Sequence, residues 1–360
     1  MNGNTRLERL RAILSKQNID AALITSEVNQ SWISDFDFSD GYVLVTQKSA
    51  HIITDFRYLE AANAQLAKGF EASAPSSMYG EIAEILKSDG ATTVMFEEAT
   101  LSVAAMGALE EKLPGISFVK GASAAVDGLR EIKDEKELAL MGKAQDIADA
   151  AFAHILKTMT PEMTEIDVAL ELEFFMRKNG ASSTSFSTIA VSGSASSLPH
   201  GVPRNVKLQK GFFTMDFGAL YKGYCSDMTR TVVLGKADAD MKKLYNTVLK
   251  AQLAGVENAR PGMGCRALDK VARDIIYEAG YEGCFGHGLG HGVGKYIHES
   301  PRVSYVAPED KLLEVGQVIT CEPGIYIPGK YGCRIEDMLA VTPDGCYNFT
   351  HSPKELIELF

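Results

Sequence analysis

Four carboxylates in otherwise apolar segments constrain the fold of this chain more than any other feature. Asp216 lies within the apolar run 212–217, and Asp227 lies in a similar segment at 225–232. The midpoint between these acids falls between Tyr221 and Lys222, in a polar segment that favours a hairpin turn. The sequence therefore predicts the two carboxylates opposite each other on adjacent strands. Because like charges repel, such a pair should bind something positive.

A second pair of acids follows the same pattern. Glu322 and Glu336 are centred on residue 329, within Ile327-Pro328-Gly329-Lys330, which is a strong turn signal. A second hairpin would therefore place Glu322 opposite Glu336. A single acid on a strand usually lies on a solvated face, but two hairpins that each present two acids are hard to explain by packing.

The segment 286–299 lies between the two predicted hairpins and is rich in glycine and histidine. It holds five glycines and three of the seven histidines of the chain. Glycines let a backbone pass close to another group, and neutral imidazoles bind metals or carry protons. The segment matches neither GxGxxG nor GxxxxGK[ST], which argues against phosphate binding. His51, His154 and His351 are interpreted as ordinary core or surface histidines.

Four carboxylates and one imidazole form an oxygen-rich set of ligands. Such a set suits two divalent cations, with Mn²⁺ or Co²⁺ as the first choice and Zn²⁺ as another. Four negative charges would offset two ions of charge +2. The residues by themselves therefore predict a dinuclear hydrolase.

Composition narrows the class of protein. A chain of 360 residues suits two domains, and its net charge of −11 argues against nucleic acid as the main partner. No apolar run approaches membrane-spanning length, and the N-terminus lacks the apolar core of a signal peptide. The six cysteines lack CxxC spacing, which favours reduced thiols in a cytoplasmic protein.

Periodicity predicts two domains with different architectures. Residues 1–125 alternate between short apolar strands and helices, as in a small α/β domain. The small residues at 121–125 are interpreted as a joint before a second domain at 130–360. That domain has an α+β order, with helices at 133–158 and 164–179 followed by a strand-rich region that helices at 238–259 and 265–279 interrupt. No internal repeat is evident.

These residues resemble one known family. The resemblance rests on the ordered acids and histidine together with the segments His287–His291, Glu322–Tyr326 and Arg334–Asp337. They are similar to the pita-bread metallopeptidases of family M24, and within it to the Xaa-Pro peptidases, prolidase and aminopeptidase P. The resemblance implies an α+β fold, in which a smaller α/β domain of the creatinase/prolidase N-terminal type precedes the pita-bread catalytic domain.

The resemblance also implies roles for the metal-binding residues. Asp216 would bind one metal ion, His291 and Glu322 the other, and Asp227 and Glu336 would bridge the two. A water or hydroxide held between the ions would attack the scissile carbonyl, and Glu322 would act as the proton shuttle.

Other residues would contact the substrate. His200, His287 and His298 match positions that line the substrate cleft and hydrogen-bond the carbonyl or the oxyanion. Arg302 matches a position that holds the C-terminal carboxylate in prolidases, although an exposed arginine after a proline is also ordinary surface.

Strand parity adds two further candidates. Arg334 lies on the same strand face as Glu336 and could pair with a metal-binding carboxylate such as Asp216. Tyr326 shares the parity of Glu322 and could reach the pocket, with a half-buried core tyrosine as the alternative.

The resemblance thus implies a homodimeric peptidase that hydrolyses the Xaa-Pro bond at the N-terminus of dipeptides or short peptides with proline in the second position. Three alternatives use the same fold. A creatinase-like amidinohydrolase works without metal, and a non-catalytic binding module usually lacks some ligands, whereas all five ligand positions are filled here. Methionine aminopeptidases usually lack a large α/β domain like residues 1–123.

Overall fold

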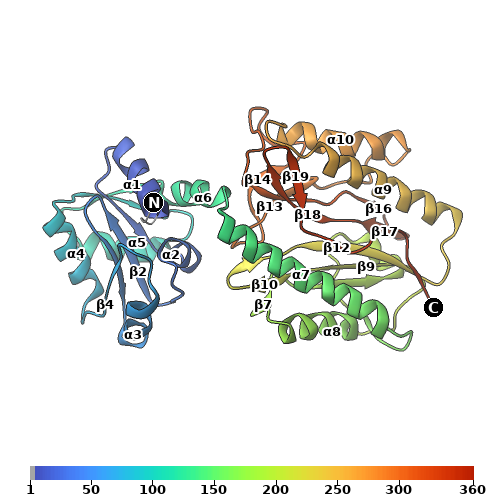
Figure 1. The fold of residues 1–360 in the computed structure, drawn as a ribbon, viewed down its shortest axis with the longest axis horizontal. Coiled ribbons are helices and arrows are strands. Elements are labelled where there is room, and N and C mark those ends of the chain that lie inside the picture. The colour runs from blue at the N-terminus through green and yellow to red at the C-terminus, as the bar shows by residue number, and fades with distance from the viewer. Residues whose placement is uncertain (1–4) are drawn as a thin grey trace. The chain divides into compact units, whose positions relative to one another are not determined.

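The computed structural model describes residues 5–360 and divides into two compact units, one ending at Arg130 and the other spanning Glu131–Phe360. Figure 1 shows the helices and strands of each unit, and each unit has its own hydrophobic core. Among residues 5–360, no helix is both long and apolar enough to cross a bilayer.

The first unit is built on a mixed six-stranded sheet in the order β4-β3-β2-β1-β5-β6. Strand β1 is central, antiparallel to β2 and parallel to β5. Its residues alternate between two cores, with Ala22 and Ile24 in one and Ala21 and Leu23 in the other. A strand buried on both faces reads as a continuous apolar run, which explains why it was predictable. The elements are α1 (Thr5–Lys16), β1 (Ala21–Ile24), α2 (Glu27–Ser34), β2 (Gly41–Thr46), β3 (Ala50–Thr54), α3 (Phe56–Gln65), β4 (Glu71–Ser73), α4 (Met78–Asp89), β5 (Thr93–Phe96), α5 (Val103–Lys112), β6 (Ser117–Lys120) and α6 (Ala122–Glu131).

The sequence analysis missed one helix of this unit and misinterpreted the start of another. Helix α2 was not predicted, although Ser26 caps it by accepting a hydrogen bond from the backbone of Asn29. The small residues 122–125, interpreted as a joint, form the first turn of α6. Alanine favours helix when its small side chain can pack, and Ala122 and Val126 are buried in the core of this unit.

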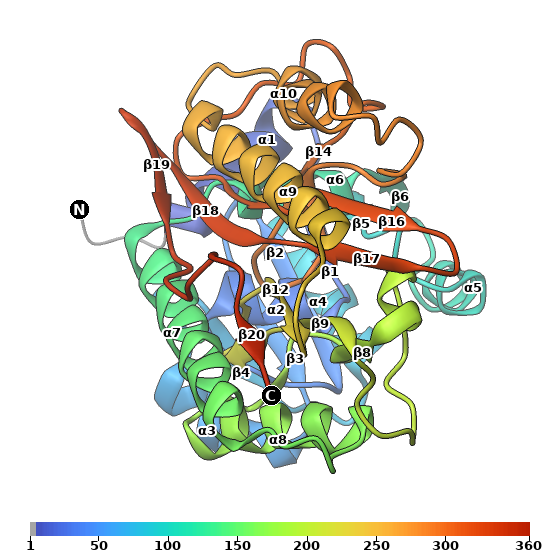
Figure 2. The same cartoon turned by 90° about the vertical axis from the view of Figure 1, so that its right-hand side faces the viewer.

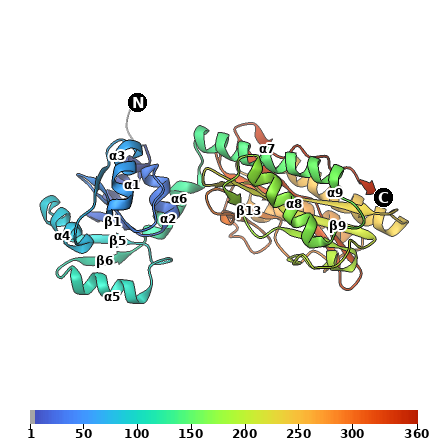
Figure 3. The same cartoon turned by 90° about the horizontal axis from the view of Figure 1, so that it is seen from below.

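The second unit has the predicted α+β order, and its elements are seen from two further sides in Figures 2 and 3. Helices α7 and α8 pack on the sheet that contains β8, β9 and β12, while α9 and α10 pack on the strands from β14 to β18. The elements are α7 (Glu135–Thr158), α8 (Glu165–Lys178), β7 (Ser183–Thr184), β8 (Ile189–Ser192), β9 (Gly211–Phe217), β10 (Ala219–Tyr221), β11 (Tyr224–Cys225), β12 (Met228–Leu234), α9 (Ala239–Asn258), α10 (Cys265–Glu278), β13 (Gly290–Gly292), β14 (Glu299–Val303), β15 (Val318–Cys321), β16 (Gly324–Ile327), β17 (Tyr331–Arg334), β18 (Asp337–Thr342), β19 (Gly345–Asn348) and β20 (Glu358–Leu359), with a 3₁₀ turn at Gly193–Ser197.

The structure reveals an internal repeat that the sequence did not show. The pairs α7–α8 and α9–α10 have the same layout, and α8 and α10 each have 14 residues and begin 100 positions apart (265 − 165). In both pairs a proline precedes the second helix, and a glycine with positive φ follows it. The shared residues are Pro161 and Pro261, and Gly180 and Gly280. The two helix pairs share few residues because the repeat lies in the backbone geometry. Only the turns need particular residues at particular places.

Candidate active site

The first pair of acids lies on β9 and just before β12, and its predicted register is wrong by two residues. Asp216 pairs with Thr229, so Asp227 lies opposite Gly218 and not opposite Asp216. The turn falls at Lys222-Gly223, both with positive φ as a tight hairpin turn requires. A shift of two keeps side chains on the same face of the strands, so the two acids become diagonal neighbours.

The second pair of acids follows the predicted register. Strands β16 and β17 pair Gly324 with Arg334 around a turn centred on residue 329. Strands β15 and β18 continue with Cys321 opposite Asp337. The two ladders share one register, which places Glu322 and Glu336 opposite each other in the gap between them.

His291 lies on β13, between two glycines that allow close strand contact. A Cβ at Gly290 would lie 2.0 Å from the carbonyl oxygen of Thr320, and one at Gly292 would lie 2.1 Å from that of Ser300. The Nδ1 of His291 contacts its neighbour's carbonyl, Gly292 O, at 3.0 Å, so it carries the proton and Nε2 is left as an acceptor. That Nε2 lies 3.6 Å from Asp227 Oδ2 and 3.4 Å from Glu322 Oε1.

The arrangement of these side chains fits a metal ion. One ligand atom from each of Asp227, His291 and Glu336 lies within 4.8 Å of the others. Asp216 Oδ1 is buried and has no hydrogen-bond partner among the described residues, although its other oxygen is paired. A buried carboxylate oxygen without a donor is costly, and a cation would satisfy it.

Burial and mutual repulsion of the acids shift their pKa values. Burial, with the charges of Asp216 and Glu322, raises the pKa of Asp227 well above its usual range. Burial and the charge of Asp227 likewise raise the pKa of Glu336. Burial, with the opposing charge of Arg334 and the adverse charge of Asp216, leaves the pKa of Glu322 at about 8. Without a cation, this cluster therefore holds protons at neutral pH.

Arg334 supplies a positive charge beside the acids, and it pairs with Asp216 as strand parity predicted. Its Nη2 pairs with Asp216 Oδ2, and its Nε donates to Thr229 Oγ1 at 3.0 Å. Its Nη1 donates to the hydroxyl of Tyr326 at 2.7 Å and to Pro199 O at 3.3 Å. Arg334 thereby links an acid, a tyrosine and the loop that precedes His200.

Tyr326 and His287 extend this chain of hydrogen bonds. The Nε2 of His287 lies 3.0 Å from the hydroxyl of Tyr326, and its Nδ1 lies 2.8 Å from Gly288 O. Burial and the charge of Arg334 lower the pKa of His287 to about 3, so the ring is neutral. Since Arg334 donates to Tyr326, the hydroxyl proton points to His287 Nε2. Both ring nitrogens of His287 are therefore occupied.

His298 and His200 lie at the exposed side of the site, and Arg302 lies on the neighbouring strand β14. The ring of His298 packs edge-on against that of His291, with centroids 4.4 Å apart. Partial burial and the nearby His200 lower the pKa of His298, while His200 itself is exposed. Arg302 is exposed on β14 between the buried Pro301 and Val303, and it makes no hydrogen bond or ion pair with any residue from 5 to 360.

Two threonines of the site were missed from the sequence. Thr229 Oγ1 donates to Glu336 Oε2 at 2.7 Å. Thr320 Oγ1 donates to Glu322 Oε1 at 3.3 Å and accepts from His291 N at 3.1 Å. Each threonine lies two residues from an acid on the same strand segment, and that parity is the signal that would have found them.

Comparison with known proteins agrees with this geometry. Residues 139–343 match the model of metallopeptidase family M24, and residues 6–132 match the creatinase/prolidase N-terminal domain. The chain therefore belongs to metallopeptidase family M24 and is a metal-dependent peptidase, with a pita-bread catalytic domain after the creatinase-type domain.

Relatives of the chain cover its full length. A solved structure of an Xaa-Pro dipeptidase from Bacillus anthracis is 44% identical, with a TM-score of 0.95 and 99% of both chains covered. The Xaa-Pro dipeptidase of Pyrococcus horikoshii is 37% identical over 98% of this chain and 99% of its own. A solved X-Pro aminopeptidase from Thermotoga maritima is 32% identical, with a TM-score of 0.90 and coverage of 96% of this chain and 99% of the other.

Proposed function

We propose that this metallopeptidase uses two divalent cations to hydrolyse the Xaa-Pro bond at the N-terminus of dipeptides or short peptides. The observation that carries the proposal is the cluster of Asp227, His291 and Glu336, which lies beside Glu322 and beside Asp216, whose Oδ1 is unpaired. The names of its relatives, Xaa-Pro dipeptidase and X-Pro aminopeptidase, support the choice of bond.

Five residues would hold the ions. Asp216 would bind one ion, His291 and Glu322 the other, and Asp227 and Glu336 would bridge them. The raised pKa values of Asp227 and Glu336 support this assignment, because these two acids keep protons unless a cation balances their charge. Divalent cations bound there would lower the pKa of water and polarise the scissile carbonyl. Mn²⁺ or Co²⁺ suits such an oxygen-rich set best, and Zn²⁺ also fits.

The side chains of the protein would then carry the proton. Glu322 would accept a proton from the attacking water and pass it to the prolyl nitrogen, which has no hydrogen of its own in the peptide bond. His298 and His200 lie at the exposed side and would donate to the substrate carbonyl or the oxyanion. His287 would contact substrate only by exchanging its bond to Tyr326 or Gly288.

Removal of metal tests the proposal first. Metal-free protein should lose cleavage of an Xaa-Pro dipeptide, and added Mn²⁺ or Co²⁺ should restore it. Full activity of metal-free protein would contradict the proposal and favour a creatinase-like amidinohydrolase, for which creatine hydrolysis is the direct assay. Absence of any hydrolysis by metal-loaded protein would favour a binding module.

Arg302 tests which peptide length is preferred. If Arg302 holds a C-terminal carboxylate, Arg302→Ala should reduce kcat/KM for an Xaa-Pro dipeptide about tenfold or more and leave an Xaa-Pro-Yaa tripeptide nearly unchanged. Arg266→Ala, which removes another partly exposed arginine of this unit, is the control. Equal effects of Arg302→Ala on both substrates would assign Arg302 to the surface. A homodimer and a cytoplasmic location stay predictions, and light scattering of the active protein tests the first.

A further inference from the structure

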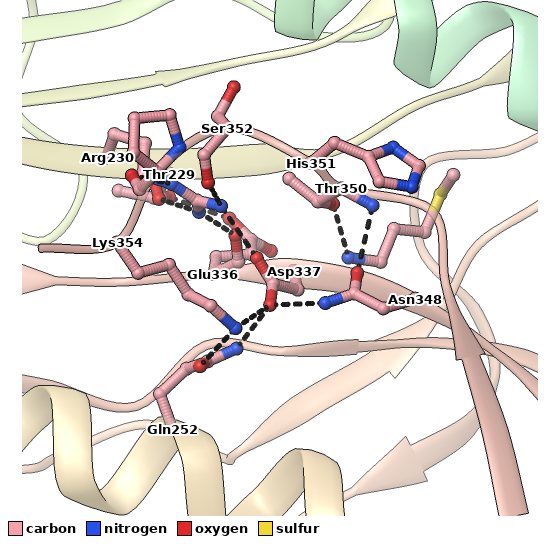
Figure 4. Close-up of polar contacts among 12 residues, drawn as sticks. Thr229, Arg230, Gln252, Glu336, Asp337, Asn348, Thr350, His351, Ser352 and Lys354 are labelled. Carbon is pink, nitrogen blue, oxygen red and sulfur yellow. Dashed lines mark hydrogen bonds and ion pairs between the residues drawn. The ribbon is translucent and has the colours of Figure 1, made fainter.

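A buried polar network lies directly behind Glu336 (Figure 4). At its centre, Asp337 is fully buried and pairs with two positively charged side chains, those of Arg230 and Lys354. Its Oδ1 accepts from Arg230 Nη2 at 2.8 Å, and its Oδ2 accepts from Lys354 Nζ at 2.6 Å. Gln252 and Asn348 each donate to Oδ2 at 2.8 Å. Asp337 therefore accepts four hydrogen bonds, two of them from the charged groups of Arg230 and Lys354.

Arg230 connects three parts of the chain through its guanidinium. Its Nη1 donates to the carbonyl oxygens of Thr229 and Glu336. Its Nη2 donates to Ser352 O at 2.8 Å, and its Nε donates to Pro353 O at 3.1 Å. The side chain is about 1% exposed, so these bonds form without competition from water.

Glu336 needs this support because the ladders on either side of it do not hold it. It lies between β17 and β18 and pairs in neither the β16–β17 nor the β15–β18 ladder. Its backbone bonds go to the neighbouring network instead. Glu336 N donates to Thr229 O at 3.1 Å, its carbonyl accepts from Arg230, and its Oε2 accepts from Thr229 Oγ1 at 2.7 Å. Carboxylates that bind metals depend on such outer contacts for their orientation.

We propose that Arg230, with Asp337 as its counter-ion, is a positioning residue that orients Glu336 for metal binding, and that the C-terminal segment 352–354 is part of this support. The proposal rests on the proposed function, in which Glu336 is a metal ligand. The planar fork of Arg230 reaches four carbonyl oxygens and a carboxylate at once, which the single ammonium of a lysine cannot do.

Calorimetric titration of Mn²⁺ alone into metal-free full-length protein tests the proposal. Arg230→Lys should weaken binding of at least one of the two Mn²⁺ ions by about 10- to 100-fold. Lys354→Met, at the edge of the network, should weaken the same ion by a smaller factor. The matched control is Arg204→Lys, because Arg204 also forks onto a fully buried carboxylate of this unit, Glu165, but contacts none of the proposed ligands. That control should bind both ions with wild-type affinity.

Wild-type affinity for both ions in Arg230→Lys and Lys354→Met would overturn the proposal. A loss no greater than in Arg204→Lys, at equal stability to urea, would also overturn it. If Arg230→Lys does not fold, Lys354→Met decides, since Lys354 lies at the partly exposed edge. Glu336→Gln distinguishes a failure of the proposed metal site from a failure of the proposed role of Arg230. If Glu336→Gln still binds two ions tightly, the proposed metal site is contradicted. If Glu336→Gln loses an ion but Arg230→Lys does not, only the role of Arg230 is contradicted.

Discussion

The phenol of Tyr326 lies between a guanidinium and a neutral imidazole, and its protonation decides the direction of the hydrogen bonds. Burial raises the pKa of Tyr326 to about 12, so the hydroxyl keeps its proton at neutral pH. It accepts from Arg334 and donates to His287. One hydroxyl thereby links Arg334 to His287, and it keeps the ring of His287 from turning freely.

Tyr326→Phe should reduce kcat/KM for an Xaa-Pro dipeptide by about 10- to 100-fold. The change leaves His287 Nε2 without a donor and removes one acceptor from Arg334, and each unpaired buried polar group costs about 1–3 kcal/mol. Metal content, measured by elemental analysis, should stay at the wild-type value because no proposed ligand is changed. Tyr224→Phe, which also removes a buried tyrosine hydroxyl but one that donates to Glu137, is the control. Unchanged kcat/KM in Tyr326→Phe would contradict this role.

Strand β13 shows at the scale of an element why its segment is rich in glycine. His291 must enter a narrow space between β14 and β15, and the residues beside it cannot carry a Cβ. The composition of this segment reflects backbone packing, whereas only His291 of its three histidines lies among the acids.

Gly290→Ala should destabilise the second unit by about 1–3 kcal/mol or more, because its Cβ would overlap the backbone oxygen of Thr320. Gly286→Ala is the matched control, since a Cβ there meets no atom within 4 Å. The midpoints of urea unfolding compare the two variants. Equal midpoints would show that β13 and β15 separate without cost.

The two predicted hairpins also differ at this scale. The midpoint of Glu322 and Glu336 coincided with the turn, because Pro328-Gly329 determines where the chain reverses. The midpoint of Asp216 and Asp227 did not, because the reversal occurs at Lys222-Gly223. A positive φ at a lysine depends on its surroundings, and residue type does not reveal it.

For the whole molecule, the buried titratable groups predict an unusual dependence of stability on pH when metal is absent. Raised pKa values of Asp227, Glu336 and Glu322 stabilise the folded state at low pH, and this contribution is lost as pH rises toward about 8, the folded pKa of Glu322. The pKa values of His287 and His291, lowered by burial to about 3 and about 4, act in the opposite sense and reduce stability as pH falls below about 6.5.

Metal-free protein should therefore lose thermal stability as pH rises from about 6.5 to about 8, where the loss from the acids is no longer opposed by the histidines. Excess Mn²⁺ should remove the loss at pH 8, because bound cations keep the acids charged. Calorimetric unfolding from pH 5 to 8.5, with and without Mn²⁺, measures both effects. Glu162→Gln, which neutralises an exposed acid, should leave the profile unchanged. A metal-free profile that rises steadily to pH 8 would contradict the assignment of these acids to one repelling cluster.

The sequence alone determined most of the elements, the acids and the family, because apolar periodicity, turn residues and ordered ligand types are local properties of the chain. Only the tertiary structure decided which groups support them. Thr229, Arg230 and Asp337 are ordinary residues in sequence, and their roles arise because strands β12 and β18 and the C-terminal segment meet behind Glu336. The repeated helix pairs were hidden for the same reason, since many sequences satisfy one backbone path. The type of each residue determines its local chemistry, whereas the contacts that orient a metal ligand depend on where distant segments of the chain come together.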